Sequence, residues 1–336
     1  TTLFRSQQEA QANNGAVDAV DPNFKLPSVV RGNFGFTHFT DFNGAAGGLF
    51  DDWTVNFDII HTRRRNAPDV IDLTLTPVGF APDGRPIFNR IDPLLAGCDA
   101  TFVGPRQGFS GPRDQLVDGG ACADPDNDQD TLLTNVDGTG GGDTSVTIRF
   151  DRGVDYMFLN KPGAFDLGFG YTYVSAREVN PTGSSTAGSN VEDVALSVVN
   201  NAPLANSRFL TRHNLVVNAT VRQDFFDDLT TSLSFVYRAT EGNPFSYTFG
   251  DDTTEDLFGD SDDEARQLFF VPTGPNDPRF DFSQFTQSEV NAFFTALDGV
   301  GLSQFGGQIA PRNAFFDPWQ HDLDLRFQQE IGRAHV

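Results

Sequence analysis

The sequence predicts an all-β, antiparallel fold, and two observations support that prediction. Apolar residues occupy every second position in several segments, which is typical of strands with one face in an apolar environment and one face in water. The links between these segments alternate between short and long. We therefore expect consecutive strands that run up and down in a single sheet.

The alternation is cleanest in residues 165–173. There Phe165, Leu167, Phe169, Tyr171 and Tyr173 alternate with Asp166, Gly168, Gly170 and Thr172. Because the side-chain period of a strand is two, the aromatic set shares one face and the small or polar set shares the other. The remaining clear segments are 53–59, 215–221, 233–239 with a continuation through Phe245, Tyr247 and Phe249, and 323–327; weaker candidates are 29–39 and 146–159.

The links sort by length. Short links are predicted at 40–52, 160–163 and 224–229, and long links at about 64–143, 180–207 and 250–318. In an up-and-down sheet successive links lie at opposite ends, so all the long links share one end. Outer-membrane barrels have short periplasmic turns and long extracellular loops, whereas a soluble sandwich has no reason to sort its loops by length.

The predicted fold is therefore part of an antiparallel transmembrane β-barrel with long extracellular loops, in which the aromatic face of 165–173 meets lipid. About seven strands are visible, too few to close a large barrel, so we expect one curved open sheet.

Composition excludes one class of protein and argues against another. No run of eighteen or more apolar residues occurs, which excludes a helical membrane protein. The formal net charge is −23, and no cluster of Lys and Arg could neutralise phosphates, which argues against a nucleic-acid partner.

Several short motifs occur in order along the chain: DPNFKLP at 21–27, YTY and SA at 171–176, GNPFSY at 242–247, LFFVP at 268–272, PRN at 311–313, PW at 318–319 and DLDLRF at 322–327. Together they resemble the barrel of TonB-dependent receptors of the Oar-like group. The resemblance implies that residues 1–330 are the C-terminal part of such a barrel without its plug domain. The last six residues, 331–336 (IGRAHV), resemble a translated sequencing adapter and are expected to be a non-native tail.

The family implies energy-dependent uptake of an unidentified solute across the outer membrane of a Gram-negative bacterium. Its implied partners are outer-membrane lipid, the protein's own plug domain and the TonB energy-coupling complex. The alternative is a non-transporting, surface-exposed structural or adhesive β-protein. An aromatic girdle at the strand ends favours the first hypothesis: Trp53, Tyr171, Tyr173, Tyr237, Tyr247 and Trp319. A plug encoded upstream in the full reading frame would decide for transport.

Cys98 and Cys122 lie in one stretch rich in Gly, Asp and Pro. This arrangement fits a single local disulfide formed in an oxidising compartment. The alternative is two unpaired thiols.

Two acidic segments are candidates for calcium. Asp124, Asp126, Asp128 and Asp130 have the spacing with which a calcium loop begins, but Gln129 replaces the expected Gly and Asn135 the bidentate Glu. A solvated acidic loop is the alternative. A second cluster could bind calcium or concentrate cationic or metal-bearing solutes: Asp251, Asp252, Glu255, Asp256, Asp260, Asp262, Asp263 and Glu264.

One helix is predicted in the last long link. Thr286 and Glu289 form a capping-box pattern, Val290, Phe293, Phe294 and Leu297 follow at helical spacing, and Gly299 is a stop signal. We expect its apolar face to pack against the loops and not to bind a partner.

Signals for catalysis are poor. The five histidines have no metal-ligand spacing, and no nucleophile motif occurs. The Gly-rich stretches 104–111 and 138–142 do not join a strand to a helix, as a phosphate-binding loop would. The sequence therefore predicts no enzyme activity and no cofactor apart from the candidate calcium.

Overall fold

The computed structural model describes residues 17–42, 44, 50–103, 115–123, 129–136, 138, 140–192, 194–226, 229–249, 258 and 266–331. Most of these residues lie in strands and connecting loops, and the sheets are largely antiparallel, so the predicted all-β class is confirmed. Within this part of the chain, no helix is both long and apolar enough to cross a membrane.

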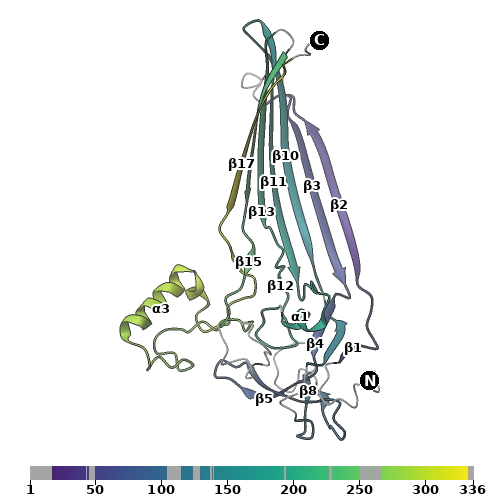
Figure 1. Cartoon of the computed structure of the whole chain (residues 1–336), viewed down its shortest axis with the longest axis vertical. Helices are drawn as coiled ribbons and strands as arrows, with labels where there is room; N and C mark the ends of the chain where they lie inside the picture. Colours follow the sequence, from purple (N-terminus) through teal and green to yellow (C-terminus); the bar gives the residue numbers. More distant parts are fainter. Residues whose placement is uncertain are drawn as a thin grey trace.

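Seven long strands form one antiparallel sheet, and each corresponds to a predicted segment (Figure 1). Their order across the sheet is β17-β14-β13-β11-β10-β3-β2, and the two-residue strand β12 (Ala205–Asn206) pairs with the end of β11. The long strands are β2 (Ser28–Phe39), β3 (Thr54–Arg65), β10 (Gly141–Phe158), β11 (Lys161–Glu178), β13 (His213–Phe226), β14 (Leu229–Thr240) and β17 (Gln320–Gln329).

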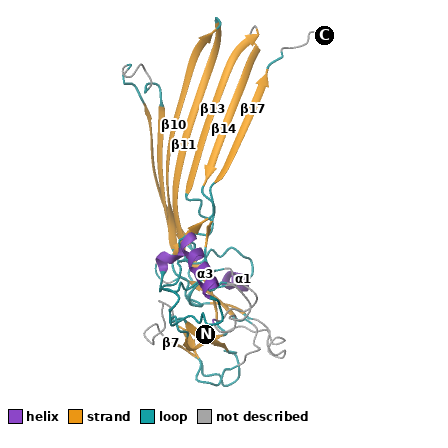
Figure 2. Cartoon of the chain, turned by 90° about the vertical axis from the view of Figure 1, so that its left-hand side faces the viewer, coloured by secondary structure: helices purple, strands orange, loops and turns teal. Residues whose placement is uncertain are grey.

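The sheet is open within the described residues, because β2 pairs only with β3 and β17 only with β14. The expectation of one open sheet is thus confirmed. Figure 2 shows the long strands side by side as a single layer that rises from the loops.

The short and long links lie at opposite ends of this sheet, as the alternation predicts (Figure 1). The link between β10 and β11 is shorter than the predicted 160–163, because pairing extends to Phe158 and Lys161. Leu159 and Asn160 form the turn with φ angles of 53° and 60°. Positive φ at both positions matches the twist of a two-residue hairpin.

The predicted continuation of β14 through Phe249 is wrong. The strand ends at Thr240, and Glu241 then pairs with Arg212 through an Nη2 to Oε1 contact of 2.7 Å. At Gly242 an added Cβ would lie 2.4 Å from the Cβ of Asp317, so this close approach requires glycine. The chain turns away here, and β15 (Pro244–Phe245) pairs instead with β16 (Phe315–Phe316).

The first long link contains most of the remaining strands. In one small sheet β9 (Thr131–Asn135) pairs in parallel with β1 (Asp18–Val20) and antiparallel with β4 (Pro68–Asp72). Two hairpins follow β4: β5 (Leu75–Phe80) with β6 (Pro86–Arg90), and β7 (Thr101–Val103) with β8 (Gln115–Val117).

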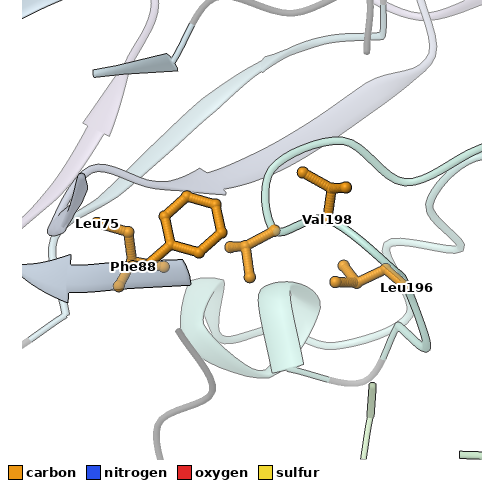
Figure 3. Close-up of a cluster of buried hydrophobic side chains, with 5 residues drawn as sticks. Leu75, Phe88, Leu196 and Val198 are labelled. Carbon is orange, nitrogen blue, oxygen red and sulfur yellow. The ribbon is translucent and has the colours of Figure 1, made fainter. Parts of the chain in front are cut away.

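The long links have a hydrophobic core of their own. Leu75 and Phe88 from the first long link pack with Leu196, Val198 and Val199 from the second (Figure 3). Burying each such side chain contributes about 1.5–3 kcal/mol relative to leaving it in water. The second link also contains the short helix α1 (Ala187–Glu192). The loops are therefore a packed body at one end of the sheet.

The predicted helix is confirmed as α3 (Gln287–Gly299) in the third long link. Thr286 is its N-cap, and both halves of the capping box with Glu289 are present. Val290 and Leu297 are buried, and Leu297 packs against Val271 and Leu302, the latter in the 3-10 helix η4 (Leu302–Phe305). The apolar face of the helix therefore packs on its own loop, as expected.

Candidate functional site

The long sheet has one apolar and one polar face. The pairing of the strands places the apolar side chains on one side in rows that cross the sheet. One row consists of Phe57, Ile148, Tyr171 and Leu215, and the next of Phe150, Phe169, Val217, Tyr237 and Leu323. We call this side the apolar face. Its apolar side chains are Phe34, Phe36, Val55, Phe57, Ile59, Val146, Ile148, Phe150, Val154, Phe165, Leu167, Phe169, Leu215, Val217, Ala219, Val221, Leu233, Phe235, Leu323, Leu325 and Phe327. Arg152, opposite Leu167, has the same register.

Large side chains on the apolar face remain accessible. Phe169, near the middle of the sheet, is 38% exposed, and Phe327 on the edge strand is 70% exposed. Monomeric soluble proteins rarely expose contiguous apolar surface on this scale, and such a patch marks a contact with another molecule or with a membrane.

The opposite side, the polar face, is lined by residues of the alternate register. Thr147 bonds Thr172 across the strands at 3.0 Å, and Thr220 donates to Ser234 at 3.1 Å. Arg222 pairs with Asp166 at 2.7 Å. These contacts satisfy polar groups within the sheet. Phe169 and Asp166 therefore lie on opposite faces, as the alternation in 165–173 predicts.

Polar aromatic residues form a row where the apolar face meets the long links. The Tyr171 hydroxyl lies 2.6 Å from Nδ1 of His213, and the Tyr237 hydroxyl lies 2.8 Å from Nδ1 of His321. Trp319 stacks on His213 with 5.9 Å between ring centres. Such side chains combine an apolar ring with a polar tip, which suits a boundary between apolar and wet surroundings.

Four of the six aromatic residues predicted to form a girdle lie in or beside this row. Tyr171, Tyr237 and Trp319 lie at this end, and Tyr173 packs beside His213. The assignment of Tyr247 is wrong: it packs in the loops with its ring centre 4.7 Å from that of Phe315. His213 and His321 were not singled out, although each stands next to an alternating segment.

The other end of the apolar face also has aromatic residues. Phe42, Phe50 and Trp53 line an open hollow of about 490 Å³ together with Phe150 and Phe169. The guanidinium of Arg152 lies 5.8 Å from the centre of the Trp53 ring. Trp53 precedes β3 at its short-link end, so it lies near a strand end as predicted, although the hollow that it lines reaches Phe169 in the middle of β11.

A polar cavity of about 280 Å³ lies between the end of β11 and the third long link, lined in part by Glu178, Arg208 and Arg312. Arg312 donates to the carbonyls of Val179 and Glu178 at 2.7 and 2.6 Å. Burial lowers the pKa of Arg312 to about 10, and the nearby carboxylates of Glu178 and Asp69 oppose that shift. This guanidinium holds the loop against the end of the strand.

A second hollow, which we call the aromatic pocket, lies beside α3. Its volume is about 440 Å³, and its lining comprises Phe269, Phe280, Phe282, Phe285, Val290 and Phe293 together with the carboxylates Asp281 and Glu289. Phe280 stacks on Phe282 with 5.9 Å between ring centres, and Phe282 lies 6.0 Å from Phe293. The sequence signal for it was the Phe-rich stretch 280–285, which shows alternation but does not form a strand.

The disulfide prediction is confirmed. Cys98 and Cys122 are bonded in the longest link, with 4.7 Å between their Cα atoms. That separation falls within the usual range for disulfides. The alternative of two unpaired thiols is wrong.

The first calcium candidate lies mostly outside the described residues, which include only Asp130. The Asp130 side chain is buried and accepts a 2.8 Å hydrogen bond from the backbone amide of Val17, an interaction that fixes β1 against β9. All eight acidic residues of the second cluster lie outside the described part of the chain. Both calcium sites therefore remain predictions.

A third group of possible metal ligands lies beside the disulfide. Asp99, Asp118 and Cys122 bring possible ligand atoms within 4.8 Å of one another. The Cys122 sulfur is already bonded to Cys98, and Asp118 accepts backbone hydrogen bonds from Gly120 and Cys122. The two carboxylates therefore serve the turn that precedes Cys122.

Comparisons with protein-family models, with curated proteins and with solved structures found no match to this chain. The resemblance to TonB-dependent receptors therefore remains a prediction from the sequence motifs.

Proposed function

We propose that this chain is part of the barrel of an outer-membrane receptor of the TonB-dependent class, which takes up a solute across the outer membrane of a Gram-negative bacterium. The observation that carries the proposal is the apolar face, which extends over all seven long strands and stands opposite a polar face. A barrel wall between lipid and a wet lumen requires this arrangement.

The dimensions of the apolar face support a membrane role. On β11 it extends from Phe165 to Tyr173, and eight steps of about 3.4 Å give about 27 Å along the strand. A strand tilt of about 40° reduces this to about 21 Å, close to the apolar band of outer-membrane barrels, about 25 Å tall. Outer-membrane lipid is the partner that covers this face.

Three further features favour a receptor barrel. The long links gather at one end, as extracellular loops do in such proteins. The polar face has small residues such as Gly168 and Gly170, which leave space for a plug domain. The outer edges of β2 and β17 can accept further strands, so the sheet can be completed to a wider barrel whose plug engages the energy-coupling complex.

Alternate cysteine labelling of β13 in the full-length protein tests the membrane assignment. A fluorophore attached to a single introduced cysteine reports the surroundings of each position. Fluorophores at 215, 217 and 219 should be quenched by lipid-borne quenchers, and those at 216, 218 and 220 by water-soluble quenchers. Val216 is informative because it is apolar but belongs to the polar register. Equal access of both quenchers to all positions would contradict the proposal and favour the surface-exposed structural or adhesive protein.

Uptake is tested separately from insertion. The full reading frame should encode a plug domain, and uptake of the solute should stop when the energy-coupling complex is deleted. A barrel that inserts correctly but lacks a plug would rule out transport while leaving the membrane assignment intact.

A further inference from the structure

The aromatic pocket is a preformed concavity. Four of its rings come from chain segments on either side of the α3 N-terminus, and they contact one another in edge-to-face, tilted and stacked arrangements. Its volume of about 440 Å³ lies within the range of about 300–1,000 Å³ that is usual for small-molecule sites. Phe285 on its wall is 58% exposed, so the pocket leaves apolar surface in contact with water.

The loop around the pocket is held in place by polar contacts. The Asp277 side chain is fully buried and receives 2.8 Å hydrogen bonds from Nε and Nη2 of Arg279 and from the amide of Thr273. At the other side the capping box of Thr286 and Glu289 fixes the start of α3. The pocket therefore does not need a ligand in order to form.

The charges around the pocket are negative. Asp281 and Glu289 line it, and the pKa of each carboxyl is lowered, for Asp281 by hydrogen bonds from Ser283 and for Glu289 by hydrogen bonds from Thr286. Arg279 is the nearby cation, but its guanidinium is bound to Asp277 and lies over the ring of Phe270 at 4.5 Å. The pocket thus combines an aromatic interior with two ionised carboxylates.

We infer that the aromatic pocket binds a small amphipathic cation, an aromatic ring that carries an ammonium group. The ring would fill the hollow among Phe280, Phe282 and Phe293, where offset and edge-to-face contacts are favourable. The ammonium group would lie at Asp281 and Glu289, or over a ring face, where a cation is attracted by the ring quadrupole. The net charge of −23 would concentrate such cations near the protein.

The inference rests on the proposed function in one respect: it names this class as the solute that the receptor takes up. Binding itself can be measured whether or not transport occurs. The pocket lies in the third long link, at the end of the sheet that the proposed function places outside the cell.

Three probes with the same ring test the charge preference: phenethylammonium, 2-phenylethanol and 3-phenylpropionate. Each is titrated calorimetrically into the full-length protein in phosphatidylcholine nanodiscs, with empty nanodiscs as the blank. We expect the cation to bind about three- to tenfold more tightly than the alcohol, the modest gain that two solvent-exposed carboxylates allow. The carboxylate probe should bind most weakly.

Three substitutions separate the aromatic and charged contributions. Phe285→Ser should weaken the binding of all three probes by a similar factor, because it removes an apolar contact with the ring that the probes share. Phe285 is mostly exposed, so the fold should stay intact. Glu289→Gln and Asp281→Asn should each lower the affinity for phenethylammonium alone, about two- to fivefold. Gln at position 289 keeps the capping box, so this variant changes charge without removing the helix start.

Asp298→Asn is the matched control, because it removes the same charge from the same helix but does not line the pocket. It should leave all three affinities unchanged. Equal affinities for the three probes, preference for the carboxylate, absence of binding, or an equal effect of Asp298→Asn would overturn the inference. Binding by a protein that fails the cysteine-labelling test would instead overturn the proposed function alone.

Discussion

Phe169 and Gly170 are neighbours in β11 that belong to opposite faces of the sheet. Phe169 lies on the apolar face between Phe150 and Val217, whereas Gly170 lies on the polar face with no heavy atom within 4 Å of the position that its Cβ would occupy. Gly168 is more crowded, because a Cβ there would lie 2.4 Å from Oδ1 of Asn218. Gly170 is therefore the better site at which to test the polar face.

Placing the same residue at both positions isolates the effect of the face. Under the proposed function, Phe169→Arg should cost about 2–4 kcal/mol, because it places a cation near the middle of the bilayer. Gly170→Arg should cost much less, since its side chain enters a wet lumen. The free energy of unfolding of the full-length protein from lipid vesicles measures both. Equal losses, or a larger loss at Gly170, would contradict the assignment of the faces.

Among the elements, α3 depends on its first turn. The side chain of Thr286 accepts from the amide of Glu289, and Oε2 of Glu289 accepts from the amide of Thr286 at 2.8 Å. Thr286→Ala should destabilise the helix by about 1 kcal/mol through loss of the cap. Hydrogen exchange of the first-turn amides should accelerate accordingly. Ser288→Ala is the control, because it truncates a similar side chain at the second residue of the helix. It should not accelerate exchange, and an equal acceleration would show that loss of the cap is not the cause.

The loop that precedes α3 should depend on pH through Asp277. The guanidinium of Arg279, together with hydrogen bonds from Thr273, holds the pKa of Asp277 well below its usual range of about 3.9. Because the folded pKa is lower than the unfolded one, the carboxylate stabilises the loop above about pH 4, and this stabilisation is lost as the pH falls through the folded pKa.

Asp277→Asn should therefore lower the denaturant midpoint for unfolding of the loop at neutral pH. The midpoint of this variant should also fall less between neutral and acid pH than that of the wild-type protein. Near-UV circular dichroism of the clustered Phe and Tyr residues can follow this transition from pH 7 to pH 2. A variant whose stability falls as steeply in acid as that of the wild-type protein would show that other carboxylates set the acid response.

At the scale of the whole molecule, the sheet and the packed loops are stabilised in different ways. The sheet is held by its cross-strand ladder and leaves an apolar face exposed, whereas the loops bury small cores such as that around Leu75 and Val199. The disulfide belongs to the loops alone, where Cys98 and Cys122 pack with Ile91.

Reduction of this disulfide should therefore destabilise the loops and spare the sheet. The bond closes a loop of 24 residues, and the lost entropy of the unfolded chain stabilises the folded loops by about 3.5 kcal/mol. Hydrogen exchange in peptides from 86–103 and 115–123 should accelerate after reduction, whereas peptides from β11 and β13 should remain protected. Matched acceleration in both regions would mean that the loops and the sheet unfold as one unit.

The sequence by itself determined the seven long strands, their faces, the sorting of their links, α3 and the disulfide. These features depend on local periodicity, capping and spacing, which act over a few residues. The tertiary structure decided where β14 ends, because the contact of Gly242 with Asp317 and the pairing of Glu241 with Arg212 join distant segments. It also decided the loop cores and the aromatic pocket, since rings from Phe269 to Phe293 meet only when the third long link folds back on itself. Alternation specifies which side chains share a face, but side chains in irregular loops converge through long-range packing that no periodic pattern encodes.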